Sequence, residues 1–233
     1  MVDREAEKQL AARHAVGYIQ NGMRVGLGSG TTAAYAIRFI GERIRAGELK
    51  ISGVPTSPAS RDLALSSGVP LADSRDGFSL DFTIDGADEA TRSGELIKGG
   101  GGALLHERIV GSASSRYIVI GDSSKLVDRL GSALLPIEVC PFGWRNALIR
   151  IQSLACTPTV RIKEDGSFFV TEEGNYIIDC SFPPEAFLRS AQLSEVIRAV
   201  PGVVDHGLFL GMTNLIVIAR GDHIEEIPIG RGK

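Results

Sequence analysis

Three carboxylates crowd into five residues of this 233-residue chain, in the run Asp85-Gly86-Ala87-Asp88-Glu89. They directly follow the run 82–84 (Phe-Thr-Ile), which has the residue types of a buried strand. Like charges this close raise one another's pKa unless cations or hydrogen-bond donors compensate. The run is therefore typical of metal binding, of acid–base chemistry or of a solvated turn. A solvated turn is a fair interpretation of Glu89 alone, but it explains an acidic motif entered from a buried strand less well.

A lysine, a run of glycines and a glutamate follow in the sequence. Lys98 precedes residues 99–102, which are all glycine, and Glu107 lies in the first turns of the helix that this run introduces. Consecutive glycines cost backbone entropy, up to about 1 kcal/mol each relative to alanine, so close approach of a ligand is the better explanation. Acidic residues near helix N-termini are also favoured, by about 0.3–1 kcal/mol, through the helix dipole. Position alone therefore does not make Glu107 catalytic.

Residues 26–33 (Gly-Leu-Gly-Ser-Gly-Thr-Thr-Ala) form a glycine-rich turn between a short apolar run and a helical pattern. Such a turn lets the backbone approach a ligand, and free N–H groups at the helix start attract an anion. The segment also fits the dinucleotide pattern G-x-G-x-x-A. That pattern expects an acidic residue at the end of the next strand, and residues 51–57 contain none, so a nicotinamide cofactor is not favoured. A tight turn capped by Ser29 or Thr31 explains the motif alone equally well.

A fourth motif, Gly121-Asp122-Ser123-Ser124-Lys125, follows the apolar run 117–120. Lys125 could bind an anion there, although a lone lysine is most often a solvated surface charge. All four motifs thus come directly after a predicted strand, and this shared location favours a ligand site. In open α/β sheets, ligands bind beyond the carboxyl ends of the strands.

The elements that must position these motifs alternate along the first half of the chain. Apolar residues recur at helical spacing in four stretches, and short strand-like runs lie between them. This alternation predicts an α/β fold with a doubly wound, mostly parallel sheet. We expect helices at 3–20, 33–44, 61–67 and 104–113, and strands at 23–27, 51–55, 82–84 and 117–120.

The pattern changes after about Leu130. A β-α-β-β-α-β order resembles a ferredoxin-like unit and predicts a second, smaller α+β domain. We expect the small domain at 131–206 and the α/β catalytic domain at 1–130 and 207–233, rejoined by the runs 214–219 and 224–229. Within the small domain the expected strands are 135–140, 157–163, 168–171, 176–178 and one after Pro201-Gly202, with a hairpin at Glu164-Asp165-Gly166 and helices at 143–154 and 184–200.

Composition excludes several classes of protein. A hydrophobic content of 43% supports a packed core, and a net charge of −3 supplies no positive field for nucleic acid or anionic membranes. No run approaches the roughly 18 apolar residues of a membrane span, and nothing resembles a signal peptide. The cysteines Cys140, Cys156 and Cys180 form no C-x-x-C pair and are expected to be buried reduced thiols. We therefore expect a cytoplasmic protein whose partners are small molecules or copies of itself.

Together, residues 28–32, the acidic run 85–89, the Lys98 loop with Glu107, and residues 121–125 resemble the type A ribose-5-phosphate isomerases. The likeness extends in order and spacing from the N-terminal helix to the segment 201–204, nearly the whole chain. It implies interconversion of D-ribose 5-phosphate and D-ribulose 5-phosphate through an enediolate, in the non-oxidative branch of the pentose phosphate pathway. It also implies a homodimer or homotetramer that needs no cofactor and no metal.

The resemblance implies that Glu107 is the proton acceptor, with Asp85 and Lys98 as further catalytic residues. A glutamate near its reference pKa of about 4.3 is ionised at pH 7 and can serve as a base. The sequence departs from the family pattern at two positions. Ser29 stands where relatives often have threonine, and His106 stands where arginine is common. The implied substrate-binding residues are Ser29, Gly30, Thr31, Thr32, Asp85, Gly86, Ala87, Asp88, Lys98, Gly99, Gly100, Gly101 and Lys125.

Two other functions fit parts of this pattern. Coenzyme A transferases share a related scaffold and can use a glutamate as a covalent nucleophile. A sugar-phosphate sensor of a transcriptional regulator would keep the pocket, but it needs a DNA-binding module, and only one helix precedes the first predicted strand. For a metal site, histidines or further carboxylates at ligand spacing would be expected, and His14, His106, His206 and His223 form no such pair.

Overall fold

A computed structural model describes residues 2–73 and 77–230 of the chain. Its largest sheet has six strands in the order β14-β13-β6-β3-β1-β2. All neighbouring strands are parallel except β14, which runs antiparallel to β13 at one edge. The strands are β1 (Arg24–Leu27), β2 (Ser52–Pro55), β3 (Phe82–Asp85), β6 (Tyr117–Asp122), β13 (Leu215–Arg220) and β14 (His223–Pro228).

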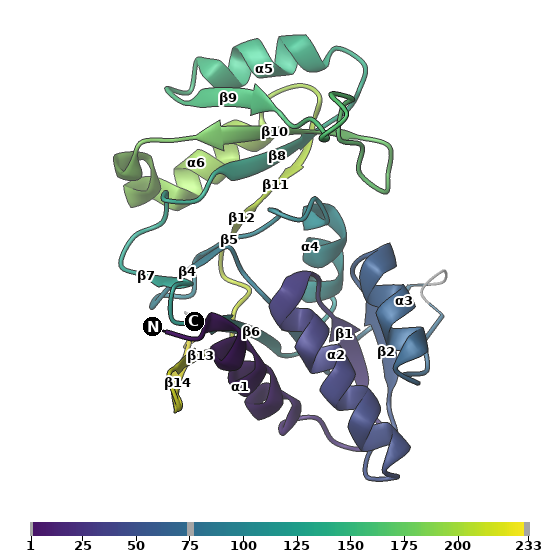
Figure 1. Cartoon of the computed structure of the whole chain (residues 1–233). Helices are drawn as coiled ribbons and strands as arrows, with labels where there is room; N and C mark the ends of the chain where they lie inside the picture. Colours follow the sequence, from purple (N-terminus) through teal and green to yellow (C-terminus); the bar gives the residue numbers. More distant parts are fainter. Residues whose placement is uncertain (1, 74–76, 231–233) are drawn as a thin grey trace.

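Helices cover both faces of this sheet (Figure 1). The first two helices pack on one face, where Ile37 contacts the same buried cluster as the strand residues Phe82 and Ile118. On the other face, Val110 of the fourth helix packs with Val54 and Leu80. This doubly covered parallel sheet confirms the predicted fold class. The helices are α1 (Arg4–Val16), α2 (Gly30–Arg45), α3 (Pro58–Ser66) and α4 (Leu104–Ser112).

The order of strands creates a switch point between β1 and β3. From β1 the chain moves to β2 on one side, and it then returns to β3 on the other side of β1. The carboxyl ends of β1 and β3 consequently carry the segments that begin at Gly28 and at Asp85 side by side, with Leu27 opposite Ile84 in the register. Crevices of this kind are where open α/β sheets bind ligands.

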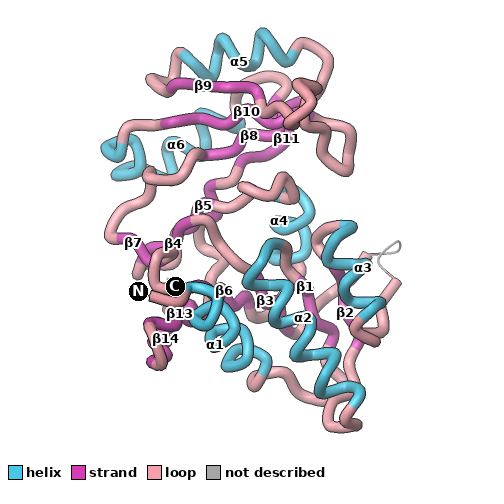
Figure 2. The backbone as a smooth tube through the Cα atoms, viewed as in Figure 1, coloured by secondary structure: helices cyan, strands magenta, loops and turns pink. Residues whose placement is uncertain are grey.

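A second sheet has four antiparallel strands in the order β11-β8-β10-β9, with two helices (Figures 1 and 2). In chain order this arrangement is 4-1-3-2 with β-α-β-β-α-β connections, as expected for a ferredoxin-like unit. It lies beside α4 on the side away from α1 (Figure 1). Its elements are β8 (Leu135–Val139), α5 (Trp144–Gln152), β9 (Thr157–Val160), β10 (Tyr176–Ser181), the 3₁₀ helix η1 (Pro184–Arg189), α6 (Ser190–Arg198) and β11 (Val203–His206).

Three expectations for this half of the chain were wrong in detail. Residues 168–171 form no strand and make only isolated bridges, from Phe168 to Ile162 and from Val170 to Tyr176. The helix expected at 184–200 begins as a 3₁₀ helix over Pro184–Arg189 and becomes α-helical only at Ser190. Cys140 and Cys156 are half-buried, since they lie at strand ends, and only Cys180 is fully buried.

A third, small sheet connects the two larger ones and was not predicted. Its strands of two or three residues are too short to show an alternating pattern in sequence. It places Glu89 in a strand with 4% of its surface exposed, and the Glu89 carboxylate accepts hydrogen bonds from the N–H groups of Gly131 and Ala133. The solvated-turn interpretation of Glu89 is therefore wrong. The strands, in sheet order, are β12 (Leu208–Phe209), β5 (Leu96–Ile97), β4 (Glu89–Thr91) and β7 (Leu126–Val127).

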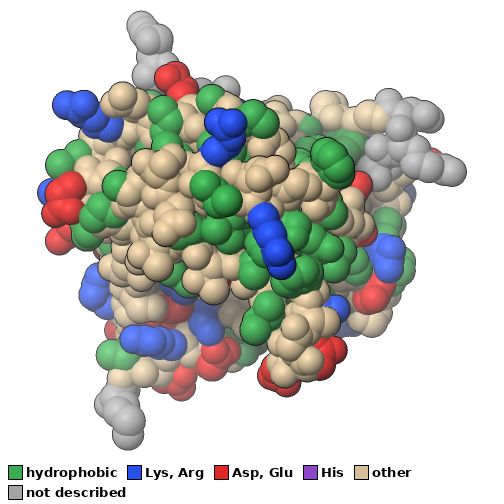
Figure 3. Space-filling model, turned by 90° about the horizontal axis from the view of Figure 1, so that it is seen from above, with side chains coloured by type: hydrophobic (Ala, Val, Ile, Leu, Met, Phe, Trp, Pro, Cys, Tyr) green, Lys and Arg blue, Asp and Glu red, His purple; other side chains and the backbone are tan. Residues whose placement is uncertain are grey.

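The surface over the second sheet mixes hydrophobic side chains with lysine, arginine and acidic side chains (Figure 3). No single sign of charge dominates this face, as the small net charge of −3 leads one to expect. Within the described residues, no helix has both the length and the hydrophobicity that a membrane crossing requires.

Candidate active site

A cleft lies at the carboxyl ends of β1 and β3, between the large sheet and the glycine run after Lys98. It brings together segments from four separate parts of the chain. Every residue that the sequence predicted to bind substrate lines it except Asp85, and Glu107 lines it as well. The lining residues are Ser29, Gly30, Thr31, Thr32, Gly86, Ala87, Asp88, Lys98, Gly99, Gly100, Gly101, Glu107 and Lys125.

Two buried charged side chains, Lys98 and Glu107, line this cleft, and the buried carboxylate of Asp85 lies beneath them. Lys98 Nζ lies 3.0 Å from Asp85 Oδ2 and 3.4 Å from Glu107 Oε2. Lys98, Asp85 and Glu107 expose 2%, 0% and 4% of their surface respectively. A single cation thus lies between two carboxylates in a region that excludes water, where electrostatic interactions are much stronger than at the surface.

Asp85 supports the floor from below instead of lining the cleft. Its Oδ1 accepts hydrogen bonds from the N–H groups of Ser29 (3.0 Å) and Gly86 (2.8 Å), and its Oδ2 from the Tyr117 hydroxyl (3.2 Å). With Lys98 also on Oδ2, both carboxylate oxygens are occupied by groups of the protein. This geometry suits Asp85 to holding Lys98 in place, and it argues against the direct contact with substrate that the family resemblance implies for Asp85.

Gly28 is required for this packing of Asp85. A Cβ atom at residue 28 would lie 2.2 Å from Asp85 Oδ1, far inside van der Waals contact. The glycine of the turn after β1 thus lets a buried carboxylate of β3 press against the backbone. This is a packing reason for the glycine, and it does not involve a dinucleotide.

The environment of Glu107 makes it a stronger base than the sequence led us to expect. Burial raises the pKa of Glu107, Lys98 lowers it, and Asp85 and Asp88 raise it again, to about 7 in total. The expectation of a glutamate with an ordinary pKa was therefore wrong. Glu107 Oε2 is buried, and among the described residues no group donates a hydrogen bond to it in acceptable geometry. Lys98 is thus the charged neighbour of this oxygen, and Glu107 lines the cleft, where a base for proton abstraction has to lie.

Lys98 keeps its positive charge in this setting. Burial alone lowers the pKa of an ammonium group, but attraction by Asp85 and then by Glu107 more than offsets it, and the pKa of Lys98 is raised well above its usual value. The Lys98 ammonium also donates to the carbonyl oxygen of Gly86 in the acidic loop. A fixed cation of this kind can stabilise negative charge that develops on a ligand.

The glycine run after Lys98 approaches the acidic loop closely. The Gly100 N–H donates to Asp88 Oδ2 at 2.8 Å, and a Cβ atom at residue 100 would lie 2.7 Å from Asp88 Oδ1. Gly99 adopts a φ of +94°, a backbone conformation that other residues avoid. Asp88 therefore faces the cleft in a fixed orientation, and the run needs glycine at these two positions for different reasons.

The other end of the cleft can hold an anion. Helix α2 begins at Gly30, and the Ser29 side chain does not cap it, because the Ser29 hydroxyl bonds to that of Thr56 at 2.6 Å. The first N–H groups of α2 thus remain open to a ligand, with the Thr31 hydroxyl nearby. Lys125 lines the same cleft, and its ammonium lies 3.5 Å from the carbonyl oxygen of Asp88.

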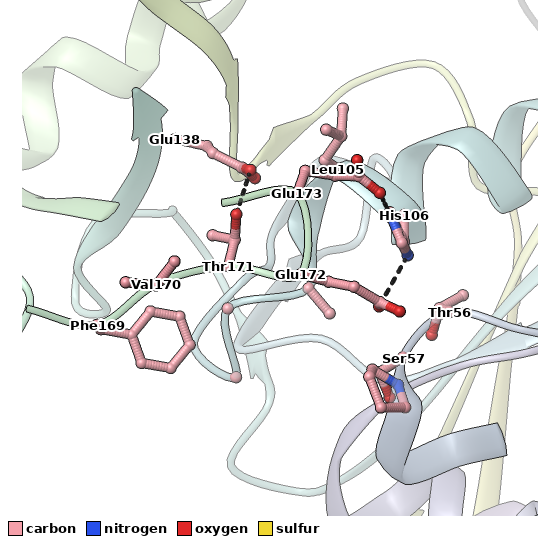
Figure 4. Close-up of a pocket in the computed structure, with 14 residues that line it drawn as sticks. Thr56, Ser57, Leu105, His106, Glu138, Phe169, Val170, Thr171, Glu172 and Glu173 are labelled. Atoms are coloured by element: carbon pink, nitrogen blue, oxygen red, sulfur yellow. Dashed lines mark hydrogen bonds and ion pairs between the residues drawn. The ribbon is translucent and has the colours of Figure 1, made fainter. Parts of the chain in front are cut away.

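Figure 4 shows a second cavity. It adjoins the first cleft, because Gly101 lines both. His106 lies between two acidic side chains there, with Nε2 2.8 Å from Glu173 Oε1 and Nδ1 3.3 Å from Glu172 Oε2. His106, which stands where arginine is common in the family, thus contacts the loop after residue 171. Its partners are these two glutamates, and they belong to the four-stranded half of the molecule.

Sequence reasoning missed two polar side chains that shape the site, Tyr117 and Thr56. Tyr117 was part of a strand-like run only, although a tyrosine in a buried strand needs a partner for its hydroxyl, which was the available signal. Thr56 directly follows β2, so its location at a strand exit could have identified it. Among the described residues, no group of three or more histidine, cysteine or acidic side chains is arranged to hold a metal ion.

Comparison with known proteins places this geometry in context. The family model for ribose 5-phosphate isomerase A (phosphoriboisomerase A) matches residues 52–223. The chain is 47% identical over 220 residues to ribose-5-phosphate isomerase A of Sphingopyxis alaskensis, covering 94% of this chain and 95% of the relative. It is 45% identical over 227 residues to the protein of the same name from Gloeobacter violaceus, covering 96% of each.

Solved structures agree with these sequence matches. A D-ribose-5-phosphate isomerase in complex with phospho-erythronic acid superposes with a TM-score of 0.93 at 31% identity, covering 97% of this chain and 99% of that one. Ribose 5-phosphate isomerase from Plasmodium falciparum gives a TM-score of 0.91 at 37% identity, with 96% and 98% covered. The likeness thus extends over both halves of the molecule.

Proposed function

Because this chain belongs to the ribose 5-phosphate isomerase A family, we propose that the cleft between β1, β3 and the glycine run is its active site. The reaction is the interconversion of D-ribose 5-phosphate and D-ribulose 5-phosphate in the non-oxidative branch of the pentose phosphate pathway. Membership of an isomerase family removes the grounds for a coenzyme A transferase or a transcriptional sensor.

The proposed mechanism moves one proton between neighbouring carbons. The Glu107 carboxylate takes the proton from C2 of the open-chain aldose, and the electron pair of that bond shifts through C1 to the carbonyl oxygen. The product of this step is an enediolate. Glu107 then returns the proton to C1, while the proton of the C2 hydroxyl passes to the oxyanion on C1, so that C2 carries the new carbonyl group and C1 a hydroxyl. General acid–base catalysis by one positioned side chain contributes typically about 10²–10⁴-fold.

One observation carries this assignment. Glu107 Oε2 is a buried carboxylate oxygen on the cleft, it lies 3.4 Å from Lys98 Nζ, and within the described chain no group donates a hydrogen bond to it. Burial raises the pKa of Glu107 to about 7, which brings it near neutral pH. Proton transfer is efficient when the pKa of the base lies near the working pH.

Stabilisation of the enediolate is assigned to Lys98 and the glycine run. Lys98 carries a fixed positive charge at the cleft, and residues 99–101 line the same cleft. Asp88 lines the cleft, unlike Asp85, so we assign it to the sugar hydroxyls and to opening of the furanose ring. For the phosphate we propose the start of α2 at Ser29–Thr32, with Lys125 as a second cation for the same group.

Three further statements are part of this proposal and follow from the sequence and the family resemblance. The chain forms a homodimer or a homotetramer in the cytoplasm. The α/β catalytic domain comprises 1–130 and 207–233, and the small domain comprises 131–206. The four-stranded sheet and its two α-helices lie between Leu135 and His206, which supports the proposed end of the small domain at residue 206.

A coupled assay on the purified protein tests the reaction and its specificity together. Ribose 5-phosphate, arabinose 5-phosphate and allose 6-phosphate are offered separately, and formation of the ketose is followed. We expect turnover of ribose 5-phosphate and much slower turnover of the other two. Absence of turnover on ribose 5-phosphate by a folded protein, at several pH values, would refute the proposed function.

A further inference from the structure

Arg161 connects the four-stranded sheet to the glycine run of the active site. It lies just after β9, and its backbone N–H donates to the carbonyl oxygen of Ile177 in β10. Its guanidinium binds Asp179 of β10 through two hydrogen bonds, from Nε at 2.7 Å and from Nη2 at 2.5 Å. Bidentate pairs of this kind fix the plane of the guanidinium as well as its position. Arg161 is therefore held rigidly by its own sheet.

The remaining nitrogen of this guanidinium reaches across to the loop. Arg161 Nη1 donates to the carbonyl oxygens of Gly100 at 3.0 Å and of Gly99 at 3.2 Å. Only 15% of the Arg161 side chain is exposed, so water competes little for these bonds. Phe169 packs on the same loop, because a Cβ atom at Gly102 would lie 2.4 Å from its ring.

Fixing a carbonyl group also fixes the N–H group on the other side of the same peptide. A trans peptide is planar, and its C=O and N–H bonds point in opposite directions. The peptide whose oxygen is Gly99 O has Gly100 N–H at its other end, and that N–H donates to Asp88 Oδ2 at 2.8 Å. Arg161 and the Gly102 N–H, the latter at 2.9 Å, thus hold the oxygen end of this peptide group, and Asp88 holds its N–H end.

The next peptide is held at one end only. Its oxygen, Gly100 O, accepts from Arg161, so the Gly101 N–H points away from the guanidinium. Gly101 lines the cleft, and within residues 2–73 and 77–230 no protein acceptor binds its N–H. Hydrogen bonding to a carbonyl also polarises its peptide and strengthens the N–H as a donor.

We propose that Arg161 is a positioning residue for the isomerisation: it holds the Gly99 and Gly100 carbonyls so that Gly100 N–H orients Asp88 and Gly101 N–H faces the oxyanion of the enediolate. This inference rests on the proposed function. Arg161 touches no reacting atom, and it acts through the loop from outside the cleft. The small domain thereby contributes to catalysis without lining the site.

The test compares Arg161→Met, Arg161→Lys and Asp179→Asn with the wild type. Each variant is assayed for kcat and KM with ribose 5-phosphate, and for the Kd of phospho-erythronic acid, whose carboxylate carries charge where the enediolate forms. We expect kcat/KM to fall about 10- to 100-fold in Arg161→Met, by analogy with removal of a side chain that orients a metal ligand. The fall should appear mainly in kcat, and the Kd of phospho-erythronic acid should rise by a similar factor.

The two conservative variants keep the test decisive if Arg161→Met folds poorly. Lysine retains the charge but cannot bind Asp179 and two carbonyls together, so Arg161→Lys should lose nearly as much activity. Asp179→Asn weakens the bidentate pair that holds Arg161 and should lose less activity than either Arg161 variant. Arg150→Met, an exposed arginine of α5, is the matched control and should behave as wild type.

Two results would overturn the inference without affecting the proposed function. One is a folded Arg161→Met or Arg161→Lys variant whose kcat/KM lies within twofold of an active wild type. The other is a loss of kcat/KM with an unchanged Kd for phospho-erythronic acid. A misplaced oxyanion donor must weaken catalysis and binding of this analogue together. An inactive wild type, by contrast, would count against the proposed function itself.

Discussion

Lys98 Nζ lies 3.4 Å from Glu107 Oε2 in a site where both side chains are more than nine-tenths buried. The same ammonium is closer to Asp85, at 3.0 Å, and Asp85 has three further donors. One positive charge thus serves two carboxylates, of which Glu107 is the less well satisfied. Because Lys98 is shared in this unequal way, the pKa of Glu107 stays raised although a lysine lies next to it.

Replacing Glu107 by glutamine removes the proposed base and keeps its shape. We expect kcat to fall by about 10²–10⁴-fold, because no other ionisable oxygen occupies that place. Binding of ribose 5-phosphate should be retained, and this can be measured by calorimetry. Glu42→Gln, at an exposed position of α2, is the control and should leave kcat unchanged. A Glu107→Gln variant with near-wild-type turnover would identify a different base.

Activity should depend on pH through Glu107. The base must be ionised to accept a proton, and its pKa is raised to about 7, chiefly by burial. We therefore expect kcat/KM of the wild type to decline as the pH falls below about 7, with a limiting slope of one. A pH profile that stays flat down to pH 5 would contradict this environment for Glu107.

The same pKa predicts how stability depends on pH. The folded-state pKa of Glu107, about 7, lies above the unfolded value of about 4.3. Between these values the folded state binds more protons, so this contribution to stability is fully present below about pH 4.3 and is lost as the pH rises through about 7. The Glu107→Gln variant has no titrating group at this position, so its stability does not decrease in this pH range for that reason. Its melting temperature relative to wild type should therefore increase between pH 5 and pH 8.

Removal of Lys98 should cost stability as well as activity. Lys98→Met leaves Asp85 and Glu107 buried together without a cation, and breaking a buried ion pair from one side costs about 3–5 kcal/mol. Chemical denaturation would measure this decrease in the free energy of unfolding. Adding Asp85→Asn should restore part of the stability, because it removes an uncompensated charge, and it should restore no activity. An equally unstable double variant would argue against a direct interaction between the two side chains.

Tyr117→Phe tests the support beneath Asp85. Loss of the hydroxyl removes one donor from Asp85 Oδ2, at a cost of about 1–2 kcal/mol of stability. Asp85 should then attract Lys98 more strongly, which weakens the stabilisation of ionised Glu107. We expect the acid limb of the pH profile to move to higher pH. An unshifted profile would mean that Tyr117 fills space only.

Metal removal gives a simpler prediction. In the part of the chain that the structure describes, no cluster of three or more metal-ligating side chains occurs, and Lys98 supplies a fixed cation at the cleft. We therefore expect activity to be unchanged after dialysis against EDTA. Strict dependence on an added divalent cation would require a different account of how the enediolate is stabilised.

Much of the fold could be predicted from local patterns. The strands that end at Leu27 and Asp85 were found because apolar runs lie directly before glycine-rich or acidic motifs. The small sheet through Glu89 escaped prediction, since a strand of three residues shows no periodicity. The segment around Phe168 has strand-like residues, yet its neighbours give it only isolated bridges.

The sequence by itself determined which residues could carry out the chemistry, because residue types and their positions after strands are local properties. The tertiary structure decided what each of them does. The pKa of Glu107 follows from burial, and the role of Asp85 follows from Tyr117, which lies 32 residues further along the chain. Arg161 reaches Gly99 across 62 residues. Burial and contacts between distant segments exist only in the folded chain, and they set the electrostatics of the site.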